Sequence, residues 1–144
     1  MIFKNVFPWW VYALFSAFFA ALTAILAKVG VKGIDSDLAT AVRTAVILLM
    51  VWSIVFIKSG VSTIYELSKT NLIFLSLSGI ATGLSWLFYF RALQLGKVSN
   101  VAPVDKASVA IAILLSVIFL HETLTLKAIF GTLLIIAGTI LVIL

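Results

Sequence analysis

The sequence has no cysteine, a single histidine and few charged residues, and each shortage excludes a class of chemistry. Without cysteine there are no disulfides, thiolate metal sites or cysteine nucleophiles. One histidine, His121, cannot form a histidine-rich metal site. None of the motifs Gly-x-x-x-x-Gly-Lys-Ser/Thr, His-Glu-x-x-His and Gly-x-Ser-x-Gly occurs in the chain. We therefore expect no enzyme activity, no ATP-driven step, no metal and no cofactor.

The scarcity of charge sets the broad class of the protein. Only 10% of the 144 residues are charged and 64% are hydrophobic, with a mean hydropathy of +1.30. A soluble domain is about half apolar and about one quarter charged. A chain this apolar cannot cover its surface with polar side chains in water, so lipid is its expected solvent.

The net charge of +5 does not indicate a nucleic-acid partner. The ten basic residues are scattered singly, mostly near the ends of apolar runs, and no basic stripe alternates with aromatic residues. Basic residues placed in this way set membrane topology and contact anionic lipid headgroups. We expect membrane lipid, and no nucleic acid, as a partner.

Five apolar runs, each of about 20 residues, account for nearly the whole sequence. At about 1.5 Å per residue, such a helix covers the roughly 30 Å hydrocarbon core. The first run is longer than the apolar core of a signal peptide, and Trp9 and Trp10 at its start are typical of a membrane interface. The polar stretch Lys58–Asn71 has room for one interfacial turn. The sequence predicts an all-α integral membrane protein with one domain, 1–144, and transmembrane helices at about 8–27, 38–57, 72–95, 101–120 and 126–144.

Residues at the ends of the runs predict how the helices begin. Pro103 lies in the first turn of the fourth predicted helix, where proline is tolerated. Ser36 or Asp37 is positioned to cap the second helix, and Glu122 the fifth. We interpret Glu122 as such a cap rather than as a proton carrier.

The basic residues leave the orientation of the chain in the membrane almost undetermined. Five spans place the amino terminus on one side together with Lys4, Lys58, Lys69 and Lys127. The other side has Lys28, Lys32, Arg43, Arg91, Lys97 and Lys106. Topology follows the basic residues, and four plus the amino terminus against six is close to balance. A protein that inserts in both orientations has such a balance, and so does a single-topology protein with a weak bias.

Ionisable residues within the spans are the first candidates for function, because each costs about 2.5–3.5 kcal/mol near a helix centre. Those in or next to the predicted spans fall toward one side of the membrane: Lys28, Arg43, Arg91, Asp105 and Lys106. Lys106 lies near a helix N-terminus, where a cation is unfavourable and needs a partner. Neighbouring helical residues diverge by about 100°, which leaves room for a partner other than Asp105. The sequence leaves two interpretations of these five residues: they form structural ion pairs, or they line a substrate or ion pathway.

The third predicted helix has a face of small and aromatic residues. Gly79 and Gly83, four apart, allow close approach of a neighbouring backbone, and Trp86 continues that face. Ser85 and Tyr89 flank it. Trp86 and Tyr89 beside Arg91 suit the floor of a pocket for organic cations or aromatic solutes. Ordinary helix packing is the alternative.

The last predicted helix has Gly131 and Gly138 two turns apart on one stripe. In lipid, such a stripe of small residues is an association surface, because close packing replaces the hydrophobic drive. We favour dimerisation through this stripe, with packing inside the chain as the alternative.

A set of short elements occurs in a characteristic order between Gly83 and Leu144: Ala92-Leu93, Gly96, Ser99, Ala102-Pro103, Glu122, Gly131 and Gly138. The first half adds Lys28-Val29-Gly30 and Arg43. With these elements the chain resembles the EamA family of the drug/metabolite transporter superfamily. The resemblance implies a five-helix repeat, of which typical EamA transporters contain two in inverted orientation. The glycine pair of the last helix also resembles the dimerisation stripe of small multidrug resistance proteins. Those proteins couple protons through a glutamate in the first helix, and this first helix has no acid.

The resemblance implies a secondary transporter of a small organic solute or metabolite, multi-pass in the cytoplasmic membrane. A single repeat regenerates two inverted repeats only as an antiparallel homodimer, which the balanced basic residues favour. A lipid-linked sugar flippase subunit and a non-transporting assembly subunit are the alternatives. The candidate pathway residues are Trp86, Tyr89, Arg91, Asp105, Lys106, Arg43, Lys28 and Ser85.

Overall fold

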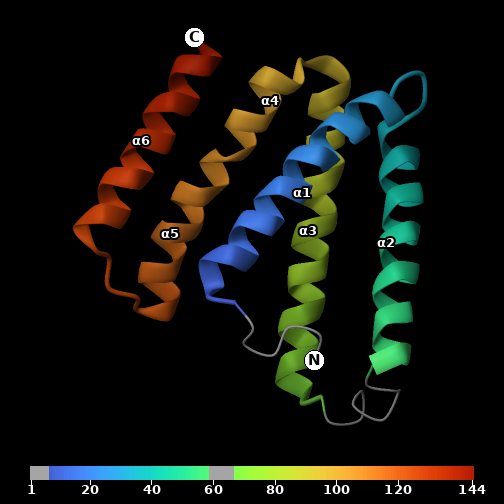
Figure 1. Cartoon of the computed structure of the whole chain (residues 1–144), viewed down its shortest axis with the longest axis horizontal. Helices are drawn as coiled ribbons and strands as arrows, with labels where there is room; N and C mark the ends of the chain where they lie inside the picture. Colours follow the sequence, from blue (N-terminus) through green and yellow to red (C-terminus); the bar gives the residue numbers. More distant parts are fainter. Residues whose placement is uncertain (1–6, 59–66) are drawn as a thin grey trace. The chain divides into compact units, whose positions relative to one another are not determined.

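The described part of the chain, residues 7–58 and 67–144 of a computed structural model, contains six helices and no strand. The helices are α1 (Trp9–Gly30), α2 (Ser36–Lys58), α3 (Lys69–Leu95), α4 (Val98–Asp105), α5 (Ala107–Leu120) and α6 (Leu126–Ile143) (Figure 1). The predicted all-α class is confirmed.

Five segments are long and apolar enough to cross a membrane, as predicted, when α4 and α5 are taken together as the span Val98–Leu120. The helix ends differ from the predicted ends by at most three residues. The interfacial turn predicted within Lys58–Asn71 falls largely on residues 59–66, outside the described residues.

Large apolar side chains are mostly exposed on the helix surfaces, as lipid contact requires. The buried apolar residues are few and mainly surround the meeting of α1, α2 and the end of α3: Ala24, Ala27, Val31, Ala39, Phe90 and Leu93. Small residues dominate this set, which is the usual composition of helix contacts in membranes.

The chain divides into two compact units, the first ending at Gln94 and the second spanning Leu95–Leu144. In the first unit, α2 begins at Ser36, one residue earlier than a cap at Ser36 would place it and two earlier than a cap at Asp37 would. The Asp35 carboxylate accepts the backbone N–H groups of Asp37 at 2.9 Å and Leu38 at 3.1 Å. Asp35 therefore caps α2, and the prediction of Ser36 or Asp37 is wrong. A cap accepts from the second and third helical residues, so it must precede the helix.

In the second unit, α4 and α5 follow one another and α6 runs back beside them (Figure 1). The helix predicted at 101–120 is interrupted at Lys106. Pro103 lies in the second turn of α4, because the helix begins at Val98. Its carbonyl accepts the Lys106 N–H at 3.1 Å and the Thr139 hydroxyl at 3.2 Å. A proline and an inserted side chain are both recognised causes of such a break.

The last helix, α6, begins at Leu126 as predicted, but its capping residue differs from the prediction. Thr125 is the cap, and its hydroxyl accepts the Ala128 N–H at 3.2 Å. Glu122 lies too far before the helix to accept from its first turn, so the predicted Glu122 cap is wrong. Instead, the Glu122 N–H donates to the Ser116 carbonyl beyond His121, which ends α5 in the left-handed conformation (φ 54°).

Candidate functional site

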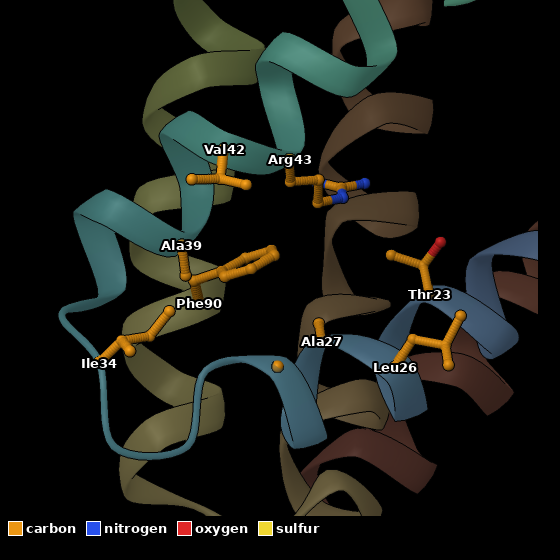
Figure 2. Close-up of a pocket in the computed structure, with 9 residues that line it drawn as sticks. Thr23, Leu26, Ala27, Ile34, Ala39, Val42, Arg43 and Phe90 are labelled. Carbon is orange, nitrogen blue, oxygen red and sulfur yellow. The ribbon is translucent and has the colours of Figure 1, made fainter.

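The first unit contains a cavity of about 370 Å³ between α1, α2 and α3. Figure 2 shows side chains from all three helices facing this space. Its lining is Thr23, Leu26, Ala27, Gly30, Ile34, Ala39, Val42, Arg43 and Phe90. Arg43 is the one ionisable residue in this lining, and most of the other residues are apolar.

Arg43 lies against two aromatic rings of α3. Its guanidinium carbon is 4.1 Å from the centre of the Trp86 ring and 5.4 Å from that of Phe90. Trp86 and Phe90 are four residues apart and therefore share one face of α3. A cation over an aromatic face is stabilised, and more so where water is scarce. The structure thus places Trp86 with Arg43 of α2, whereas the sequence analysis grouped it with Arg91.

The carboxylates near Arg43 in sequence are engaged elsewhere. Asp35 accepts backbone N–H groups at the start of α2, and Asp37 accepts the Ser36 hydroxyl at 3.3 Å. Within the described residues of the first unit, no carboxylate pairs with Arg43. Its positive charge therefore lies at the cavity with aromatic rings and Tyr89 as neighbours, and without a counter-ion among the described residues of this unit.

A second cavity, of about 710 Å³, lies beside the first, because Ile34 lines both. It is lined by Lys28, Val29, Val31, Lys32, Gly33, Ile34 and Gln94. The Lys28 ammonium donates to the Leu93 carbonyl at the end of α3. Gly33 has φ 78°, a left-handed value that glycine adopts without strain and that turns the chain between α1 and α2.

Arg91 lies at the surface of α3 and forms a short polar chain. Its Nη1 donates to Gln94 Oε1 at 2.9 Å, and Gln94 Nε2 donates to the Ile34 carbonyl at 2.7 Å. Arg91 does not line the first cavity. Lys28, Arg43 and Arg91 thus belong to the first unit, and each has a distinct set of partners.

Asp105 and Lys106 belong to the second unit and pair with each other. Lys106 Nζ is 3.1 Å from Asp105 Oδ2, with 57% and 35% of the two side chains exposed. The two side chains pair although they are adjacent in sequence, at the point where the helix is interrupted.

The other predicted residues do not line the first cavity. Ser85 is exposed, and Tyr89 is half-buried, interacts electrostatically with Arg43 and has its ring centre 6.5 Å from that of Phe90. A methyl group added at any of the four predicted packing glycines would meet no atom of its own unit within 4 Å; these are Gly79, Gly83, Gly131 and Gly138. Their faces are therefore not used for close packing within either described unit.

Three residues of the two cavities were not predicted from the sequence: Phe90, Thr23 and Gln94. Phe90 had a usable signal, because it follows Trp86 by four residues and continues the same face. Thr23 and Gln94 had none. A threonine within an apolar run and a glutamine near a helix end are ordinary, and their neighbours come from distant segments.

The sequence profile described as the EamA-like transporter family matches residues 7–144. An uncharacterized transporter of Sinorhizobium sp, encoded in the cobO 3′ region, is 48% identical over 133 residues, covering 92% of this chain and 94% of that protein. An uncharacterized protein of Methanocaldococcus jannaschii is 42% identical over 65 residues, covering 45% of this chain and 47% of that protein.

The uncharacterized transporter YvbV of Bacillus subtilis is 42% identical over 73 residues, covering 51% of this chain and 23% of YvbV. YvbV is therefore about twice as long as this chain. No solved structure matches the chain.

Proposed function

We propose that this chain, which belongs to the EamA-like transporter family, is a secondary transporter that moves a small organic solute by alternating access. The family and the five apolar helices make it a multi-pass membrane protein with a transporter role. We place it in the cytoplasmic membrane and propose that two copies act together as an antiparallel homodimer.

The observation that carries the dimer is the size of the chain relative to its relatives. This chain, with five candidate spans among its described residues, matches the Sinorhizobium transporter over 94% of that protein's length, whereas YvbV is about twice as long as this chain. Two inverted repeats around a central site are a common basis of alternating access. Two copies inserted in opposite orientations supply the same number of helices. The near-balance of basic residues is compatible with both orientations.

Solute binding is assigned to the first cavity. It combines an apolar lining with one cation held in place by aromatic rings, the usual composition of a small-molecule site. The glycine faces of α3 and α6, which the described units leave open, offer surfaces for contact between helices of different copies.

A thermal-stability screen of the purified chain against metabolites tests this function. A solute at 100 times its dissociation constant stabilises the folded state by about 2.7 kcal/mol and raises Tm. The same solute should then exchange across proteoliposomes that contain the chain, and not across empty liposomes. A stabilising solute that never exchanges would rule out transport.

A further inference from the structure

We propose that the first cavity binds a small organic anion, with a carboxylate on Arg43 and an apolar body against Phe90 and the lining of α1. This inference rests on the proposed transport function and names the solute class for the same cavity. Three observations support it: the way Arg43 is held, the sign of the charges around both cavities, and the size and polarity of the lining.

Arg43 is held by contact with an aromatic ring rather than by a carboxylate of the described residues. The guanidinium carbon lies 4.1 Å from the centre of the Trp86 ring. The N–H donors of a guanidinium point outward in the plane, in the fork that matches a carboxylate. Among the described residues, no carboxylate pairs with Arg43, and Tyr89 is its neighbouring polar side chain. An arginine in an apolar setting needs acceptors, and an anionic solute supplies them.

The ionisable side chains that line the two neighbouring cavities are all basic. Arg43 lines the first, and Lys28 and Lys32 line the second. No acidic residue lines either cavity. A cleft lined by one sign of charge concentrates solutes of the opposite sign. A cationic solute would meet repulsion here, and Arg43 already covers the Trp86 face that a cation would use. These charges favour an anion over the organic cation considered from the sequence.

The dimensions of the cavity limit the solute to a small molecule. About 370 Å³ is near the lower end of the roughly 300–1,000 Å³ found for ligand pockets. Phe90, Leu26 and Val42 offer apolar contact beside the guanidinium. One ring or a short chain carrying a carboxylate fits this combination of a single cation and an apolar lining.

The test uses the fact that the chain has two arginines, Arg43 and Arg91. In Arg91→Lys, Arg43 is the only guanidinium that can react with phenylglyoxal. The rate of Arg43 modification is measured by peptide mass spectrometry on the full chain in phosphatidylcholine nanodiscs. Phenylacetate, phenylacetamide and 2-phenylethylamine serve as probes, because they share a ring and differ in charge.

Phenylacetate at ten times its dissociation constant should slow Arg43 modification about tenfold, and the amide and the amine should not. The matched control is Arg43→Lys, in which phenylacetate should leave the modification rate of Arg91 unchanged. In a direct binding assay, Arg43→Gln should weaken phenylacetate binding about 10- to 100-fold. This result would support the anion site.

Equal protection by the amide, protection by the amine, or no protection by phenylacetate would overturn the inference. Replacing part of the phosphatidylcholine with phosphatidylglycerol separates a soluble anion from a lipid headgroup. Protection of Arg43 by phosphatidylglycerol alone would assign the cavity to lipid and overturn it as well. None of these measurements depends on transport. Exchange of some solute with Arg43 unprotected would overturn only this inference, and protection without any exchange would overturn only the transport proposal.

Discussion

A guanidinium within a membrane-spanning helix is costly, about 2.5–3.5 kcal/mol near the centre on insertion scales. Arg43 is seven residues into α2, so it lies about 10 Å from the start of the helix. The rings of Trp86 and Phe90 offset part of that cost. At the scale of single residues, Arg43 is therefore stabilised by two aromatic rings of α3, Trp86 and Phe90, which are four residues apart in the sequence.

A double-mutant cycle measures this contact. We expect Arg43→Gln and Trp86→Leu to show a coupling energy of about 0.5–2 kcal/mol in the free energy of unfolding in detergent. The matched control pairs Trp86→Leu with Arg91→Gln, which should be additive because Arg91 bonds to Gln94. Additive behaviour of the Arg43 pair would show that the ring does not hold the guanidinium.

Asp105 gives a second prediction at this scale. Its pair with Lys106 is largely exposed, so its loss should change stability by no more than about 1 kcal/mol. If Asp105 belongs to the solute pathway, Asp105→Asn should be expressed and folded normally and should lose solute exchange. Glu122→Gln, outside the candidate pathway, serves as the control with normal exchange. An Asp105→Asn chain that fails to fold would identify the pair as structural.

At the scale of helices, the interruption of the fourth span is the main feature of the second unit. The Thr139 hydroxyl, buried in α6, donates to the Pro103 carbonyl at 3.2 Å. Thr139→Val, close in shape, should destabilise the chain by about 0.6 kcal/mol, the average for such bonds between membrane helices. Thr139→Ser keeps the hydroxyl and should stay near wild type. Equal Tm values for Thr139→Val and Thr139→Ser would show that the bond contributes nothing.

The sequence predicted the helices well and their interruptions poorly. Apolar runs of spanning length are a strong signal, because lipid requires a long uninterrupted apolar surface. The break at Lys106 was missed because helix 4 begins three residues earlier than predicted, which moves Pro103 from the first turn to the second. The cap Asp35 was missed for the same reason, since a cap depends on the first helical residue and α2 begins two residues before the predicted start. The start of α6 was predicted correctly, and its cap was missed because Glu122 was preferred to the adjacent Thr125.

For the candidate site, the sequence indicated two of the residues but not the contact between them. Arg43 and Trp86 both stood among the predicted pathway residues, because a charge and an aromatic residue within spans are visible in sequence. Their contact was not predicted, because it depends on how α2 and α3 are rotated toward each other. Hydrophobic periodicity gives little of that rotation when a helix is apolar on all sides.

At the scale of the whole molecule, five candidate spans within the described residues predict that the two ends of the chain lie on opposite sides of the membrane. The natural chain has no cysteine, so Phe7→Cys and Leu144→Cys can be combined without other changes. An impermeant thiol reagent added to one side of sealed vesicles should label each molecule once. Double labelling of single molecules, seen as two mass additions, would contradict five spans.

The central claim is that two copies in opposite orientations form the transporter, and fixing the orientation tests it most directly. Because the basic residues are nearly balanced, adding two lysines near Lys4 and Lys69 should fix one orientation. Adding them near Lys32 and Lys97 should fix the other. Cysteine labelling at Phe7 verifies the orientation of each form before its transport is measured.

The measurement is exchange of the stabilising solute by cells that express either fixed form alone or both together. We predict that each form alone is inactive and that co-expression restores exchange, because only the mixture contains inverted copies. Exchange by either fixed form alone would contradict the antiparallel homodimer and would point to a parallel assembly or a different partner.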